Sequence, residues 1–215
     1  MKSLVLVGIM VMMLLITGNS PSVAQAKAAM EDNPLLQPYR TPFATPPFDR
    51  IRNEHYLPAI EEAIRREQIE VDAILKDGNP PTFENTLVAL DQTGNLLSLV
   101  YAAFGGVQSA NTSPELQKIG EQVSPLMTAH RDNISLNPAL FARIKAVYDR
   151  RGTLKLDKVQ SYMLENTYKN FVRSGALLDE KQKTRLRDVN KEISLLSLKF
   201  GNNLLAEAND FKLVL

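Results

Sequence analysis

The chain contains no cysteine, and this absence narrows both its chemistry and the ways in which it can be stabilised. Without cysteine there are no disulfides, no thiolate zinc sites, no cysteine nucleophile and no lipidated cysteine of the kind found in bacterial lipoproteins. The folded part must therefore be held together by burial of an apolar core. A chain of 215 residues, 44% of them hydrophobic, is long enough for one sizeable domain or two small ones.

Net charge is also nearly absent, because 25 lysine and arginine residues face 24 aspartate and glutamate residues. A balanced chain creates no overall field that would attract nucleic acid or an anionic membrane surface. We therefore expect no nucleic acid among its partners.

The motifs of common catalytic sites are missing as well. There is no His-Glu-x-x-His zinc motif, no Gly-x-Ser-x-Gly nucleophile elbow, and no Lys-Ser or Lys-Thr after Gly105-Gly106 to indicate a phosphate-binding loop. The two histidines, His55 and His130, are 75 residues apart, and neither has a glutamate or histidine three or four positions away to complete a zinc pair. The sequence predicts no catalytic residue, no cofactor-binding residue and no metal ligand in this chain.

The titratable residues that stand out have structural interpretations. We expect His130 to be a packed or half-buried histidine on an apolar stripe, and His55 to belong to a helix start or to contact the segment before it. The acidic pairs Glu61-Glu62 and Asp179-Glu180 are expected to be solvated surface charges, since neighbours on a helix point in different directions. The basic run from Lys181 to Arg187 is expected to be a solvated helix face.

The first 26 residues are typical of an export signal. Lys2 supplies a basic start, Leu4 to Ile16 is an apolar run of 13 residues, and Ala24-Gln25-Ala26 has the small-x-small pattern of a cleavage site. The alternative is a membrane anchor, but a helix needs roughly 20 apolar residues to cross a bilayer. We expect cleavage after residue 26, export to the periplasm, and no stable membrane anchor afterwards.

Residues 27–49 form a proline-rich segment that precedes the helices. Proline has no amide donor and restrains the residue before it to extended geometry, so this segment is expected to be non-helical. Because Tyr39, Phe43 and Phe48 are interleaved with the prolines, we expect an ordered strap that lies on the helices rather than a free tail.

Residues 50–210 show helical periodicity from end to end, which predicts an all-α lobe of about six amphipathic helices. The expected helices cover about 53–76 and 82–105, begin at Ser113 and at Asn137, cover about 156–174, and begin at Asp179. Gly94 is expected to interrupt the second helix and Gly105-Gly106 to end its regular part. Pro125 is expected to kink the third helix or to end its first half.

The last helix has the clearest apolar stripe. Leu186, Val189, Ile193, Leu196 and Phe200 follow one another at steps of three, four, three and four residues. Beyond it, Phe211-Lys212-Leu213-Val214 alternates with a period of two, which predicts a β-strand. A lone strand leaves its backbone groups unpaired, so we interpret residues 211–215 as the start of a truncated continuation.

Four segments resemble one family of peptidases in order and spacing. They are Phe48-x-x-Ile51-x-x-x-His55-x-x-Pro58-Ala59, Pro81-Thr82-Phe83-Glu84-Asn85-Thr86-Leu87, Asn137-x-x-Leu140-Phe141 and Tyr168-x-x-Phe171-x-Arg173-x-Gly175. Together they make the chain similar, from about residue 43 to 211, to the N-terminal region of the zinc oligopeptidases. This is the thimet oligopeptidase, oligopeptidase A and peptidyl-dipeptidase family, and the peptidyl-dipeptidase branch is the most similar.

The resemblance implies a two-lobed, mostly helical ellipsoid with a deep channel for short unfolded peptides, in which the N-terminal lobe forms one wall. It also implies one zinc ion in the full-length parent, bound by the two histidines of His-Glu-x-x-His and a downstream glutamate, with the glutamate of the motif as base for a bound water. Those residues belong to a later part of the family's chains, so none can be assigned to a position here. No cofactor is expected in this chain itself.

Two functions follow as hypotheses. The first is the channel wall of an exported zinc-dependent oligopeptidase that removes dipeptides from the C-terminus of short peptides, with the missing catalytic half and the peptides as partners. The alternative is a complete, non-enzymatic helical module that binds peptides or proteins. An unrelated helical bundle is a third possibility that the four ordered segments disfavour.

Overall fold

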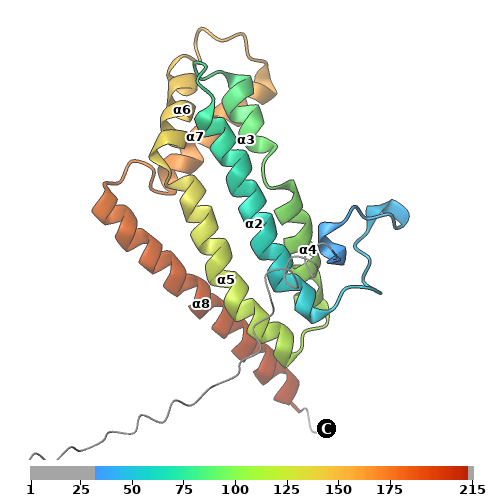
Figure 1. Cartoon of the computed structure of the whole chain (residues 1–215). Helices are drawn as coiled ribbons and strands as arrows, with labels where there is room; N and C mark the ends of the chain where they lie inside the picture. The colour runs from blue at the N-terminus through green and yellow to red at the C-terminus, as the bar shows by residue number, and fades with distance from the viewer. Residues whose placement is uncertain (1–31, 213–215) are drawn as a thin grey trace, which may run out of the picture.

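The computed structural model describes residues 32–212, and this part of the chain consists of helices joined by short loops (Figure 1). The longer helices are α2 (Asn53–Lys76), α4 (Asn95–Ala110), α5 (Pro114–Ser135), α6 (Pro138–Asp149), α7 (Lys158–Arg173) and α8 (Glu180–Asp210). The short elements are the 3-10 turns η1 (Pro34–Leu36) and η2 (Pro42–Ala44), the π-helical η3 (Phe83–Val88) and α3 (Ala89–Asp91). No β-strand occurs between residues 32 and 212, so the predicted all-α class is confirmed.

The predictions for the two ends of the chain fare differently. The signal peptide predicted over residues 1–26 lies outside the described residues, and so do residues 213–215 of the predicted strand. The strand is wrong for the two residues that are described, because Phe211 ends α8 as its C-cap and Lys212 has no regular structure. An alternating pattern needs a neighbouring strand before it can form a ladder.

Four helices lie side by side and form a wall. α4 packs against α2, α2 against α5, and α5 against α8, so that α8 lies at one edge of the row (Figure 1). At one end of the wall α6, α7 and η3 pack together, and α6 also contacts α2.

Two separate apolar clusters form the core of the described residues, and α2 contributes to both. The first lies between the N-terminal half of α2, α4, α5 and η1, and contains Leu35, Tyr56, Ala59, Ile60, Ala63, Leu97, Val100, Ala103, Phe104, Leu116 and Val123. The second lies between the C-terminal half of α2, η3, α6 and α7, and contains Val71, Ile74, Phe83, Leu87, Leu140, Phe141, Ile144, Val147, Leu164, Phe171 and Ala176. We call them the first and second clusters.

The described part of the proline-rich segment packs against α2 and α4 through η1, and of the three aromatic residues that suggested this, only Tyr39 is partly buried. Leu35 is fully buried in the first cluster, and the Asn33 side chain donates a hydrogen bond to the carbonyl oxygen of His55 at 2.9 Å. Phe43, in contrast, is 100% exposed and Phe48 is 51% exposed. An ordered strap therefore rests on a leucine and an asparagine, not on its two phenylalanines.

Gly94 interrupts the second predicted helix as expected. Its φ of +72° is in the left-handed region that favours glycine, and it separates α3 from α4. Among the described residues, the stretch Phe83–Ala110 is long and apolar enough to cross a membrane by length and composition. Because it is interrupted at Gly94 and buries Phe83, Leu87 and Leu97 in the two clusters, it serves here as core helices.

The predicted helix end at Gly105-Gly106 is wrong, and so is the alternative in which Pro125 ends the first half of the third helix. The other alternative, a kink at Pro125, stays a prediction. α4 continues through Gly105-Gly106 to Ala110, and α5 continues through Pro125 to Ser135. Neither glycine has a positive φ, and a helix interior tolerates glycine at a cost of about 1 kcal/mol relative to alanine. Packing of each helix against α2 outweighs these unfavourable local preferences.

Candidate functional site

Three of the four segments that carry the family resemblance meet in the second cluster. Phe83 and Leu87 enter it from η3, Leu140 and Phe141 from α6, and Phe171 from α7. The resemblance is therefore carried mainly by side chains that build one hydrophobic core and fix the angle between three helices.

The start of η3 shows why its sequence is so specific. The Thr82 hydroxyl accepts a hydrogen bond from the Asn85 backbone N–H at 3.0 Å, and the Thr82 backbone N–H donates to Asn85 Oδ1 at 2.7 Å. This reciprocal pair satisfies two donors that a helix start leaves without partners. Asn85 Nδ2 also donates to Asp77 Oδ2 at 3.0 Å, which ties the end of α2 to the start of η3. The predicted cap at Thr82 is confirmed, and its role is structural.

The loop between α2 and η3 is further fixed by charge. Hydrogen bonds from the backbone and side chain of Asn79 lower the pKa of Asp77, with smaller contributions from Arg143 and Asn85. Arg143 Nη1 donates to the Asp77 carbonyl oxygen at 2.9 Å, so α6 is tied to the same loop. The carboxylate thus stays ionised and acts as an anchor for three separate segments.

Aromatic rings stack across α6 and α7 beside the second cluster. Tyr148 and Tyr168 lie face to face with ring centroids 3.9 Å apart, and Phe141 lies 5.7 Å from Tyr168 and 6.4 Å from Phe171. The Arg151 guanidinium lies 4.1 Å from the centroid of Tyr148. The stack accounts for the Tyr-x-x-Phe spacing in α7 as a helix-packing device.

Both histidines lie where the sequence predicts them. His55 is in the first turn of α2, where its Nδ1 accepts a hydrogen bond from the Arg52 backbone N–H at 3.0 Å and its carbonyl oxygen contacts Asn33. His130 is 5% exposed, and its Nε2 lies 2.9 Å from Oε2 of Glu67 on α2. Glu67 could not have been singled out from the sequence, because it is 63 residues from His130 and only the packing of α2 against α5 brings the two together.

A zinc site of the kind that the resemblance implies does not fit these residues. Such a site needs three protein ligands that converge on one point. Within residues 32–212 there is no group of three or more histidine, cysteine, aspartate or glutamate side chains that could hold a metal ion. His130 already has Glu67 as its partner, and His55 uses Nδ1 to cap α2.

Two of the expected surface charges are buried instead. Glu62 is 8% exposed, and its carboxylate accepts hydrogen bonds from Arg65 Nε at 2.7 Å and from Arg66 Nε at 2.8 Å. Lys183 is 4% exposed and donates to Glu180 Oε1 at 3.2 Å. The prediction of solvated faces is wrong at these positions because one residue of each run faces a neighbouring helix. Asp179, meanwhile, caps α8 by accepting the Gln182 backbone N–H.

The hydrogen bonds of Glu62 with Arg65 and Arg66 predict that the stability of the protein depends on pH. Hydrogen bonds from Arg65, followed by Arg66, lower the pKa of Glu62 from 4.5 to about 2, against the opposing effect of burial. A lowered pKa means that the stabilisation is present above pH 4.5 and is lost as the pH falls through about 2. Because the two arginine side chains are 60% and 47% exposed, screening should limit the effect. We expect Glu62→Gln to lower the free energy of unfolding by about 1 kcal/mol at pH 7.

This prediction is tested by urea unfolding of the wild type and Glu62→Gln at pH 7 and pH 2.5. The difference between the two proteins should shrink at the lower pH. A difference that stays constant between the two pH values would show that the carboxylate charge is not the cause.

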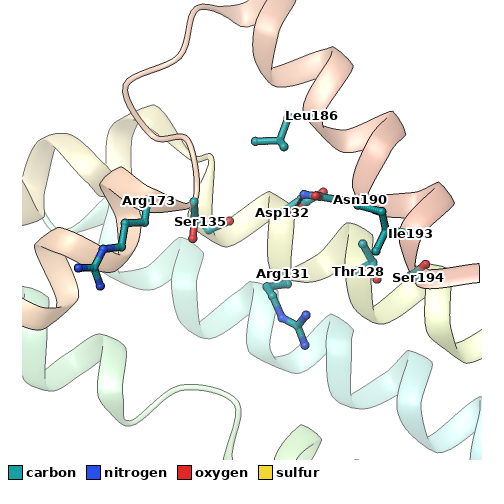
Figure 2. Close-up of a pocket in the computed structure, with 10 residues that line it drawn as sticks. Thr128, Arg131, Asp132, Ser135, Arg173, Leu186, Asn190, Ile193 and Ser194 are labelled. Atoms are coloured by element: carbon teal, nitrogen blue, oxygen red, sulfur yellow. Dashed lines mark hydrogen bonds between the residues drawn. The ribbon is translucent and has the colours of Figure 1, made fainter. Parts of the chain in front are cut away.

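A polar groove of about 400 Å³ runs between α5 and α8 (Figure 2). It is lined by Thr128, Arg131, Asp132, Ser135, Arg173, Ser174, Leu186, Asn190, Ile193 and Ser194. Across the α5–α8 seam, Asn190 Nδ2 donates to Asp132 Oδ1 at 2.9 Å, and Arg187 Nη1 donates to Asn133 Oδ1 at 2.9 Å. Polar side chains therefore contribute to the contact between the two helices.

Most of the apolar stripe of α8 is exposed beyond this seam. Ile193 is 55% exposed, Leu196 58%, Phe200 69% and Leu204 60%. We call these four side chains the outer stripe of α8. The predicted stripe is therefore correct as a pattern, but only its first members, Leu186 and Val189, are partly buried by the described residues. The outer stripe and the groove share Ile193 and form the part of this surface that is best suited to contact another molecule.

Comparison with known proteins shows which proteins this chain is similar to. Over 177 residues, 82% of the chain, it is 41% identical to the dipeptidyl carboxypeptidase of Salmonella typhimurium. It is 38% identical over 174 residues to the dipeptidyl carboxypeptidase of Escherichia coli and 28% identical over 173 residues to the oligopeptidase A of Escherichia coli. No family model matches the chain.

The chain is thus a homologue of the dipeptidyl carboxypeptidases and oligopeptidases A, and the predicted resemblance to this peptidase family is confirmed. The higher identity to the two dipeptidyl carboxypeptidases agrees with the branch that the sequence predicted. The matched segments make up 26%, 26% and 25% of these three relatives, so the chain spans about a quarter of their length.

Proposed function

We propose that this chain is the N-terminal wall of the substrate channel in a longer, exported zinc peptidase, which removes dipeptides from the C-terminus of short peptides. The observation that carries the proposal is the 41% and 38% identity to two dipeptidyl carboxypeptidases over about four fifths of the chain. The arrangement of α4, α2, α5 and α8 in one row supports the role of a wall.

The chemistry of the proposal belongs to the rest of the parent protein. His55 caps α2 and His130 pairs with Glu67, and within residues 32–212 no three histidine, aspartate or glutamate side chains converge as metal ligands. Zinc in the parent would polarise the scissile carbonyl and activate water. Here the chain contributes shape: its helices would exclude folded proteins from the channel and leave room for short extended peptides.

Export is supported by the sequence before the wall. The apolar run from Leu4 to Ile16 and the Ala24-Gln25-Ala26 pattern favour removal of a signal peptide and release into the periplasm. We propose short peptides and the catalytic half as partners, with no nucleic acid and no stable membrane anchor after cleavage.

The test of the proposal is the DNA that follows the codon for Leu215. Read in all three forward frames, it should encode a His-Glu-x-x-His motif within the next several hundred codons, either directly in frame or after a stop codon or frameshift. If no frame encodes the motif, the proposal fails and a non-enzymatic binding module becomes the better account.

A further inference from the structure

The outer stripe of α8 begins in the core and then emerges from it. Leu186, two steps before Ile193 on the same face, is half-buried, and its Cδ2 would lie 2.8 Å from a Cβ added to Gly175 at the turn between α7 and α8. From Ile193 onwards each member of the stripe is more than half exposed. The apolar face is therefore continuous, but the part of it beyond about residue 190 has no cover among residues 32–212.

The polar and apolar faces of α8 are arranged in an unusual way for a helix at the edge of a small domain. On the face toward α5, Asn190 Nδ2 donates to Asp132 Oδ1, and the backbone carbonyl oxygen of Ser194 accepts a hydrogen bond from the Ser124 hydroxyl. The outer stripe extends from Ile193 to Leu204 over about 17 Å of helix at 1.5 Å per residue, and each of its four side chains is more than half exposed. Monomeric proteins rarely expose an apolar patch of this kind unless it is an interaction site.

We propose that the outer stripe of α8 is the surface on which the remainder of the parent polypeptide docks to close the channel. This inference rests on the proposed function. The length of the relatives indicates what covers the stripe. The matched relatives are about four times as long as the segment that this chain shares with them. The parent therefore has ample chain to cover a face that this quarter of the protein leaves open.

The absence of native cysteine makes a direct test possible. Leu196→Cys and Phe200→Cys place single thiols on the outer stripe, and Lys199→Cys is the matched control. Lys199 is an exposed neighbour on the same turn of α8, about 100° around the helix from Phe200. Each variant is made in the 215-residue chain and in the parent that includes the continuation encoded downstream. Labelling by a soluble maleimide is followed by mass spectrometry of the peptide that contains the new cysteine.

We expect all three thiols to be labelled rapidly in the 215-residue chain. In the parent, labelling at positions 196 and 200 should be at least tenfold slower, while labelling at position 199 changes less than twofold. Circular dichroism and thermal unfolding of each variant show whether the substitution has altered the fold.

The other outcomes overturn the inference in distinguishable ways. If the parent releases dipeptides but positions 196 and 200 stay as reactive as position 199, the docking surface is wrong while the proposed function stands. If light scattering shows that the 215-residue chain is a dimer with positions 196 and 200 protected, a second copy of the chain covers the stripe. If no continuation is encoded, the proposed function fails, and this inference fails with it.

Discussion

Replacing Leu87 by alanine should lower the free energy of unfolding by about 3 kcal/mol, one of the two largest single-residue effects that we expect among the described residues. Leu87 is 1% exposed and lies in the second cluster, where η3 meets α6 and α7. The loss combines the apolar surface that is no longer buried with the cavity that remains, and such a cavity closes poorly where three helices converge. Chemical unfolding followed by far-ultraviolet circular dichroism measures it.

The matched control is Leu99→Ala on α4. Leu99 is 53% exposed and belongs to neither cluster, so its truncation should change the free energy of unfolding by less than about 0.5 kcal/mol. If Leu87→Ala and Leu99→Ala lower the free energy of unfolding by the same amount, the segment that carries the family resemblance is not the packing centre described above.

Gly94→Ala should lower the free energy of unfolding by about 3 kcal/mol, because two separate effects add. A φ of +72° costs a residue with a Cβ about 1–2 kcal/mol. The new Cβ would also lie 2.5 Å from Cδ and Oε1 of Glu67, so the carboxylate must move. Moving it breaks the contact with His130, which is 5% exposed and would lose its partner.

Gly105→Ala gives a control with the opposite sign. Gly105 lies inside α4, and a Cβ added there would meet no atom within 4 Å. Alanine at this position should therefore stabilise the protein by about 0.5–1 kcal/mol. When Glu67 is already replaced by alanine, Gly94→Ala should lower the free energy of unfolding only by the amount that the positive φ causes. An unchanged cost in that background would rule out the contact with Glu67 as a cause.

The helices could be predicted because their signals are local. The starts at Thr82, Ser113, Asn137 and Asp179 each need only a polar side chain that bonds to a backbone N–H two or three residues ahead. The burial of Ile60, Val71 and Ile144 likewise follows from spacing along one helix. The same reasoning failed where packing between helices decides, as at Gly105-Gly106 and Pro125, where the helix continues.

The features of the candidate surface could not be predicted, because each depends on residues far apart in the chain. Glu67 and His130 meet only when α2 packs on α5, and Asp132 and Asn190 only when α5 packs on α8. The stripe of α8 was visible in the sequence, but periodicity does not say which face a neighbour will cover. Lys183 is buried for the same reason, although it lies in a strongly basic run.

We propose that this chain supplies part of the shape of a peptidase channel and that the rest of the parent supplies the hydrolytic chemistry. The most direct test is release of C-terminal dipeptides from a short peptide, with zinc added, by the purified 215-residue chain and by the parent that includes the continuation. The account predicts no release by the chain alone and zinc-dependent release by the parent. Zinc-dependent release by the 215-residue chain alone would contradict it.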